Sequence, residues 1–243
     1  EIWSTLTSTK GELDELWYRL YCAVSRCNRA LVSLQQNGES TLGAEVTKQR
    51  EAEVRFLRAH FYFKLLTMYR QIPWIDEKVY EDKATESTSN TQFTYEELWQ
   101  KVIADFQTAY DVLPAKQKDG GRVNKIAAAG YLAKCYLTIA WGDGYEATDG
   151  VDHINKEYMQ KVVDYTDVVK NSDYGYMADF GDIFLPDNKN SKESVFAVQT
   201  SDYSEDHTNF GRANWSNMLN GCWGIWSCGW DFHKPSQDLV NAF

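Results

Sequence analysis

The stretch from Ala44 to Pro73 reads AEVTKQREAEVRFLRAHFYFKLLTMYRQIP, and it decides how this chain folds. Apolar side chains recur in it every three or four residues, which places them on one face of an α-helix. A first set forms that face and a second set widens it: Ala52, Phe56, Ala59, Phe63 and Leu66, then Leu57, Phe61, Leu65 and Met68. Because the apolar face is wide, we expect one helix from about residue 44 to Arg70 at the centre of the fold, ended by Pro73.

Similar periodicity predicts helices on both sides of this central one. The preceding helix is expected to end at Asn37 and Gly38, residues that favour helix termini. Its apolar stripe consists of Leu13, Leu16, Leu20, Val24, Cys27, Leu31 and Leu34. After the central helix, Thr94 and Glu97 have the spacing of a capping box, in which both side chains bind free backbone amides at a helix N-terminus. That helix should stop before Pro114, and two more helices are expected over about 123–141 and 155–171.

These helices are joined by short connections and are expected to form antiparallel pairs, as in a tetratricopeptide-like array. After about residue 172 the helical periodicity is lost. Residues 194–199, SVFAVQ, predict a short strand, and residues 200–234 are rich in Asn, Gly, Ser and Trp. We therefore expect a mainly α fold, in which residues 1–172 form a tetratricopeptide-like helical scaffold. Residues 173–243 should form an irregular, loop-rich lobe containing short strands.

Charge and composition argue against several classes of function. The chain has 35 acidic and 25 basic residues, a net charge of −10 and no basic stripe, so we expect no nucleic-acid partner. No apolar run is long enough to cross a membrane. Phosphate-binding glycine motifs and zinc-type spacings of Cys and His do not occur, so we expect no metal and no cofactor. The sequence begins at Glu1 and stops at Phe243 within an apparent helix, so both ends are expected to be truncated.

The central stretch also resembles a known family. Residues 53–66, followed by Tyr69 and Ile72-Pro73, are similar to the central helix motif of the SusD/RagB family. These are starch-utilisation-type, glycan-binding lipoproteins of Bacteroidetes outer membranes. Further stretches agree in chain order: 102–114, 121–137, 174–199 and 235–240. Arg70 departs from the family, which usually has glycine there, and this should affect a helix end more than function.

The resemblance implies a non-catalytic protein on the cell surface that binds glycan without transforming it. It also implies a lipid anchor in the outer membrane and a SusC-like TonB-dependent transporter as partner. In the family the tetratricopeptide-like helices face the transporter and loops hold the glycan. This sequence lacks the family's N-terminal lipid-attachment cysteine and its C-terminal portion, so the anchor and the localisation are implied by the family alone.

A glycan site is predicted in the irregular segment from residue 210 to residue 230. Sugars present an apolar C–H face and a rim of hydroxyl groups, so a site needs flat aromatic faces surrounded by polar side chains. This segment holds four tryptophans among three asparagines and an arginine. Trp3 is added because residues before the first long helix can reach the ligand in the family. The candidate ligand-binding residues are Trp215, Trp223, Trp226, Arg212, Asn214, Asn217, Tyr203 and Trp3.

Two other functions stay open. One is a tetratricopeptide-like protein-interaction scaffold without a small ligand, in which the tryptophans merely pack. The other is a helical glycoside hydrolase, which needs two carboxylates roughly 5–10 Å apart, one of them with a raised pKa. The candidate acidic clusters are Asp143, Glu146 and Asp149, and Glu205 with Asp206, although a solvated acidic loop is the simpler interpretation.

Overall fold

The computed structural model describes residues 11–142, 153–199 and 237–242. The chain divides into two compact units, residues 1–197 and 198–243. In the second unit, α8 (Gln237–Ala242) confirms the helix expected after residue 235, and its Leu239 and Val240 are about half exposed. The predicted boundary near residue 172 stays a prediction.

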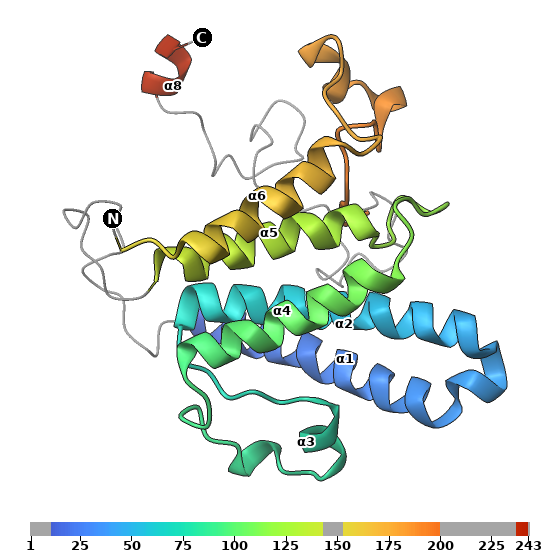
Figure 1. Ribbon diagram of the computed structural model, residues 1–243, viewed down its shortest axis with the longest axis vertical. Helices are drawn as coiled ribbons and strands as arrows, with labels where there is room; N and C mark the ends of the chain where they lie inside the picture. The colour runs from blue at the N-terminus through green and yellow to red at the C-terminus, as the bar shows by residue number, and fades with distance from the viewer. Residues whose placement is uncertain (1–10, 143–152, 200–236, 243) are drawn as a thin grey trace, which may run out of the picture. The chain divides into compact units, whose positions relative to one another are not determined.

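The first unit is built from helices that pack on one another in chain order (Figure 1): α1 against α2, α2 against α4, α4 against α5, and α5 against α6. Their bounds are α1 Gly11–Leu42, α2 Ala44–Tyr69, α3 Glu77–Glu81, α4 Tyr95–Val112, α5 Lys125–Trp141 and α6 Lys156–Lys170. Short 3-10 turns are η2 Thr85–Ser87, η3 Phe180–Phe184 and η4 Pro186–Asn188. This arrangement confirms the mainly α, tetratricopeptide-like fold.

Several predicted helix ends are confirmed. The side chain of Thr94 accepts a hydrogen bond from the Glu97 amide and the Glu97 carboxylate accepts one from the Thr94 amide, which completes the capping box of α4. The central helix α2 runs from Ala44 to Tyr69, one residue short of the expected end. Arg70 follows it with a positive φ of 60°, a conformation that glycine adopts most easily. Its guanidinium lies 5.0 Å from the centre of the Tyr95 ring, so the departure from the family's glycine does act at a helix end.

The expected end of the first helix at Asn37 and Gly38 is wrong. Helix α1 continues to Leu42 and the turn into α2 is made by Gly43, whose φ is 83°. Gly38 is buried, and a Cβ atom on it would lie only 2.6 Å from Cγ2 of Thr47 in α2. Gly38 therefore permits the close approach of α1 and α2, a use of glycine that a local helix-ending signal does not reveal.

The predicted strand over residues 194–199 is also wrong. No strand forms anywhere in the described residues, and here the backbone bends. The Phe196 ring packs edge-on against Phe56 of α2, with 5.5 Å between ring centres. The Val195 carbonyl accepts its hydrogen bond from the side chain of Asn124. The apolar residues in this segment therefore serve packing on helices, because no neighbouring strand supplies backbone partners.

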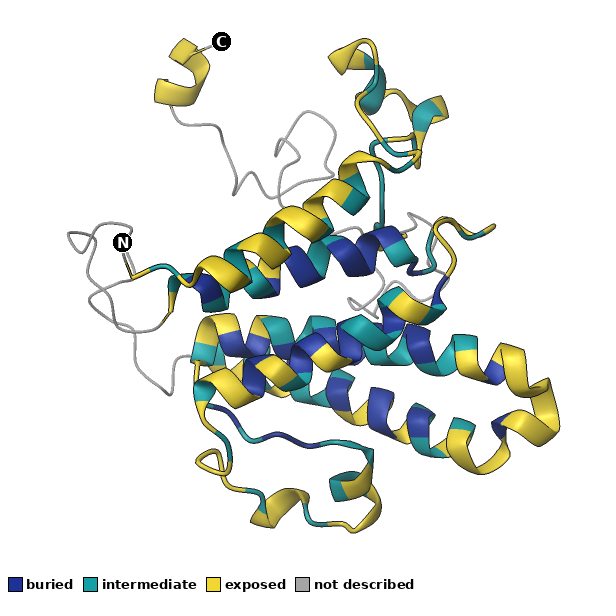
Figure 2. Cartoon of the chain, viewed as in Figure 1, coloured by how far each residue is buried: buried dark blue, intermediate teal, exposed yellow. Residues whose placement is uncertain are grey.

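The core lies along α2, α4 and α5, where buried residues concentrate (Figure 2). Phe56, Tyr62, Trp99 and Phe106 are its largest fully buried side chains. One predicted member of the central apolar face is misplaced, because Met68 is 52% exposed in the last turn of α2. By contrast, α6 has no buried residue at all. The buried core is therefore centred on α2 and does not extend into α6.

A buried ion-pair network joins four helices at the centre of this core. Arg58 of α2 donates to Asp105 of α4 through Nε and Nη2, at 2.7 and 2.9 Å, and to Asn28 of α1 at 3.0 Å. It also pairs with Glu77 at the start of α3. Arg55, one turn earlier, reaches both Glu77 and Asp105 at 3.1 Å. The network therefore fixes α1, α3 and α4 to the same side of α2.

Glu77 makes the stability of this network depend on pH. Burial raises the pKa of Glu77, but the charges and hydrogen bonding of Arg58 and Arg55 outweigh burial and lower the pKa to about 2 from 4.5. A carboxylate whose pKa is lower in the folded state stabilises the fold above its unfolded pKa, and this contribution is lost as the pH falls toward the folded pKa. We therefore expect Glu77 to stabilise the protein fully above pH 4.5 and to lose this effect between pH 4.5 and about 2. The free energy of unfolding in urea, measured against pH for the parent and for Glu77→Gln, checks this.

The variant removes the one titration of interest and leaves the other carboxylates in place. The parent should be more stable than Glu77→Gln at neutral pH, and the two curves should converge in acid. A stability difference that stays constant across the acid range would contradict the assignment.

Candidate functional site

The ligand residues predicted from the sequence lie outside the described residues. This applies to Trp215, Trp223, Trp226, Arg212, Asn214, Asn217, Tyr203 and Trp3. It applies as well to the acidic clusters considered for a hydrolase, Asp143, Glu146, Asp149, Glu205 and Asp206. The predicted roles of these residues therefore stay predictions, and the described part of the chain offers a different site.

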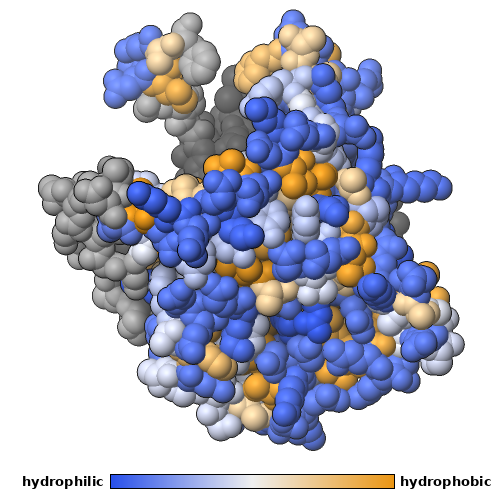
Figure 3. All heavy atoms as spheres, in the orientation of Figure 1, coloured by the Kyte–Doolittle hydropathy of each residue, from blue (hydrophilic) through white to orange (hydrophobic). Residues whose placement is uncertain are grey.

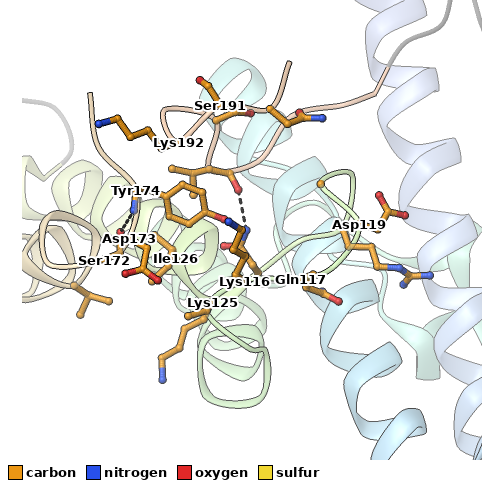
Figure 4. A pocket seen from close by; sticks show the side chains of 18 of the residues that line it. Lys116, Gln117, Asp119, Lys125, Ile126, Ser172, Asp173, Tyr174, Ser191 and Lys192 are labelled. Atoms are coloured by element: carbon orange, nitrogen blue, oxygen red, sulfur yellow. Dashed lines mark hydrogen bonds between the residues drawn. The ribbon is translucent and has the colours of Figure 1, made fainter. Parts of the chain in front are cut away.

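A pocket of about 460 Å³ opens where three segments of the first unit meet (Figure 4). The segments are residues 115–126 between α4 and α5, residues 168–174 at the end of α6, and residues 190–195. We call it the polar pocket, because most of the residues that line it carry amide, hydroxyl, carboxylate or basic side chains. Its volume falls at the low end of the range for ligand sites, roughly 300–1,000 Å³.

The first wall of the polar pocket is fixed to the core by Glu53 of α2, which is 8% exposed. The Glu53 carboxylate accepts hydrogen bonds from Arg122 at 2.7 Å, from Gln117 at 3.1 Å and from Arg50 at 2.8 Å. Gln117 also donates to the carbonyl of Val123 in the same loop. Charge-assisted hydrogen bonds of this kind are stronger than neutral ones, so the loop between α4 and α5 is held in one shape.

Asn124 ties all three segments together and is 3% exposed. Its oxygen caps α5 by accepting from the Ala127 amide at 2.9 Å. Its nitrogen donates to the Val195 carbonyl at 2.8 Å and to the Tyr174 hydroxyl at 3.1 Å. Burial raises the pKa of Tyr174, and the bond to Asn124 offsets this only in part, so the hydroxyl is neutral at pH 7. One buried amide therefore positions the back of the pocket.

Several polar side chains that line the polar pocket have no hydrogen-bond partner among the described residues. Within the described part of the chain, these side chains accept or donate no hydrogen bond: Lys116, Asn171, Asp173, Ser191, Lys192 and Ser194. Figure 4 shows the Tyr174 ring in the middle of the pocket, with Ser172 and Asp173 on one side and Lys116 and Gln117 on the other. The pocket thus combines a fixed interior with free donors and acceptors, and it can hold a small polar molecule.

A second concavity, of about 710 Å³, lies beside it along α5 and α6. We call it the apolar groove, because its lining is mostly aliphatic and aromatic: Gly130, Ala133, Leu137, Val162, Val169, Tyr176 and Val195 are among its residues. Tyr176 is 88% exposed. Figure 3 shows apolar side chains reaching the surface around α5 and α6 on a face that is otherwise mostly hydrophilic. Such a groove suits an apolar surface better than a hydroxyl-rich ligand.

The described carboxylates give no support to acid–base catalysis. Glu53, Glu77 and Asp105 are all paired with arginines. Where a carboxylate pKa clearly departs from its ordinary value in this part of the chain, at Glu77 and Glu97, it is lowered. A glycosidase acid requires a raised pKa. Among the same residues no group of three metal-binding side chains forms. No described helix has the length and apolarity to cross a membrane.

The polar pocket was not predicted from the sequence. The signals were present as turn-forming residues, Asp119-Gly-Gly121 and Asn171-Ser-Asp173, but such clusters predict a loop and not what it faces. At Gly120 a Cβ atom would lie 3.3 Å from the Asn190 side chain, so glycine allows two loops 70 residues apart to approach. Only the folded chain brings these segments together.

The two functions of Asn124 can be separated by mutation. Asn124→Asp keeps an oxygen that caps α5 and loses the nitrogen that donates to Val195, whereas Asn124→Ala loses both. We expect amides at 190–197 to exchange hydrogen faster in both variants, and amides at the start of α5 to exchange faster only in Asn124→Ala. The alanine variant should lose about 1–3 kcal/mol of stability, since it also leaves the partly buried Val195 carbonyl unpaired. Hydrogen exchange with mass spectrometry checks this, and unchanged exchange at 190–197 in Asn124→Asp would contradict it.

Comparisons with known proteins place this fold in a family. A SusD-like protein of Bacteroides ovatus is 26% identical over 242 residues, which are 98% of this chain and 42% of that protein. A solved structure with xylogluco-oligosaccharide is 25% identical, with a TM-score of 0.65, over 82% of this chain and 38% of the other. A SusD superfamily protein of Parabacteroides distasonis is 25% identical, with a TM-score of 0.62, over 81% of this chain and 39% of the other. The chain therefore spans less than half the length of each relative.

The family itself is identified by sequence. Residues 1–137 match the SusD-like family that is described as starch-binding associating with outer membrane. The match includes α2 with residues 53–66, which carried the resemblance, and it extends over more than half of the 243 residues. The chain therefore belongs to the SusD-like family.

Proposed function

We propose that this protein binds glycan without transforming it, at the outer membrane, for delivery to a TonB-dependent transporter. The observation that carries the proposal is the family match over residues 1–137, since the family is described as starch-binding and associated with the outer membrane. Because the chain spans less than half of its relatives, ligand, partner and location of the whole protein are all part of the proposal.

The solved relative with xylogluco-oligosaccharide supports the choice of a glycan as ligand. It shares 25% of its aligned residues with this chain, and the alignment extends over 82% of the chain. Binding is passive, through stacking of sugar rings on aromatic faces and hydrogen bonds to hydroxyl groups. Its affinity depends on how well the contacting segments are held in place before the ligand arrives.

Within the chain we assign the main ligand contacts to residues 210–230. Trp215, Trp223 and Trp226 supply the aromatic faces, and Arg212, Asn214 and Asn217 supply hydroxyl partners. Tyr203 and Trp3 are further candidate ligand contacts. The assignment is supported by the density of tryptophan and asparagine in this stretch, which no repeating helical pattern explains.

The proposal includes a surface lipoprotein that partners a SusC-like transporter. The family description supports the outer membrane as location. A lipid anchor and the transporter belong to the family as a whole, and the tetratricopeptide-like helices are the surface we assign to the transporter. Among the described residues the apolar groove leaves apolar side chains such as Tyr176 uncovered on this unit, which also keeps a purely protein-binding scaffold open as the second candidate.

Tryptophan fluorescence during titration with soluble polysaccharides tests the proposal. We expect a saturable change in the parent that is lost in Trp215→Ala or Trp223→Ala while circular dichroism stays that of a helical protein. Removing a stacked aromatic ring costs roughly 1–3 kcal/mol, which weakens binding about five- to 150-fold.

The matched control is Trp99→Phe. Trp99 is fully buried in α4 and its indole N–H has no hydrogen-bond partner among the described residues, so phenylalanine should be tolerated and the glycan response kept. A response lost in Trp99→Phe and kept in both loop variants, or no response to any polysaccharide, would overturn the assignment.

A further inference from the structure

We propose that the polar pocket is a second ligand site, which takes one or two rings of a neutral sugar. The described residues of its lining all belong to three segments of the first unit, residues 115–126, 168–174 and 190–195. The hydrogen-bonding pattern of the lining selects the class of ligand, a small compound with several hydroxyl groups. The choice of a sugar within that class rests on the proposed function.

Buried polar groups hold the polar pocket open. Glu53 and Asn124 are 8% and 3% exposed, and both direct their hydrogen bonds to the segments that form its walls. Burying a carboxylate and an amide is unfavourable unless every bond is made. A shape fixed in this way needs little reordering when a ligand enters, which favours binding.

Three polar side chains of the lining are free to bind a ligand. Asp173 and the two hydroxyls of Ser191 and Ser194 have no hydrogen-bond partner among the residues the structure describes, although they line the same cavity. A carboxylate accepts hydrogen bonds, and a serine hydroxyl both donates and accepts. A sugar hydroxyl also does both, so a ligand rich in hydroxyls can satisfy all three groups at once.

The charged side chains and the aromatic ring of the lining favour a neutral ligand. Two acidic residues, Asp119 and Asp173, line the pocket together with basic ones, so the lining is mixed in sign. Figure 4 shows Lys125 and Lys192 extending away from Tyr174, the one aromatic ring among the described residues of the lining. Lys125 instead lies 4.5 Å from the centre of the Tyr110 ring. Lys125 and Lys192 therefore do not converge on one anion, and Tyr174 offers an aromatic surface next to the free hydroxyls.

Titration of the isotope-labelled full chain with D-glucose, D-galactose, D-xylose, maltose and cellobiose, followed by amide NMR, tests this. At least one sugar should shift the amides of residues 171–175 and 190–195 in a saturable way. Each of Ser194→Ala and Asp173→Ala should weaken that binding roughly three- to tenfold, the usual effect of one lost hydrogen bond. Asp187→Ala, an exposed acidic residue outside the pocket, is the matched control and should bind as the parent does.

The two sites are separated by the double variant Trp215→Ala with Trp223→Ala. Shifts at the pocket amides that persist in this variant support the pocket, whatever happens to polysaccharide binding. Polysaccharide binding without any shift at the pocket amides would overturn the pocket and leave the proposed function intact. Shifts that are as strong in Ser194→Ala and Asp173→Ala as in the parent would also overturn it.

Discussion

The buried pair of Arg58 and Asp105 is the interaction on which the rest of this structure depends. Both side chains are almost fully removed from water, at 3% and 6% exposure. Taking two charges out of water costs several kcal/mol per ion, and only complete hydrogen bonding offsets it. Arg58 achieves this with Asp105, Glu77 and Asn28, which lie on three other helices. The pair therefore determines which helices can surround α2, because any other arrangement leaves a charge buried and unpaired.

A second ionic centre on the same helix directs the fold toward the candidate site. Glu53 lies about one turn before Arg58 and binds Arg122 and Gln117 of the connection between α4 and α5. Asn124, at the end of that connection, then binds the segment near Val195. Helix α2 thus holds the helical core through Arg58 and the walls of the polar pocket through Glu53. Stability and ligand binding share this helix, so damage to either centre should be felt in both.

The sequence predicted those features whose signals are local. The apolar periodicity of α2 and the capping box at Thr94 depend on residues a few positions apart, and both are confirmed. The role of Gly38 cannot be predicted from its neighbours in sequence, because it depends on the close contact with Thr47 on another helix. The ion pair of Arg58 and Asp105 could not be predicted either, because its two members are 47 residues apart in the sequence. The polar pocket needs three separate loops, so turn-forming residues alone could not predict it. The tryptophan segment stays a prediction, because its residues lie outside the described part of the chain.

The most direct test of this account is the free energy of unfolding of Asp105→Asn, measured in urea beside Asp111→Asn. Both are carboxylates of α4, but Asp111 is exposed and, among the residues that the structure describes, accepts a side-chain hydrogen bond from Gln107 alone. Asp105→Asn should lose about 3–5 kcal/mol, because Arg58 is left without its main counter-charge in the core. Asp111→Asn should stay within about 0.5 kcal/mol of the parent. If Asp105→Asn were as stable as Asp111→Asn, the buried pair would not be what holds these helices together.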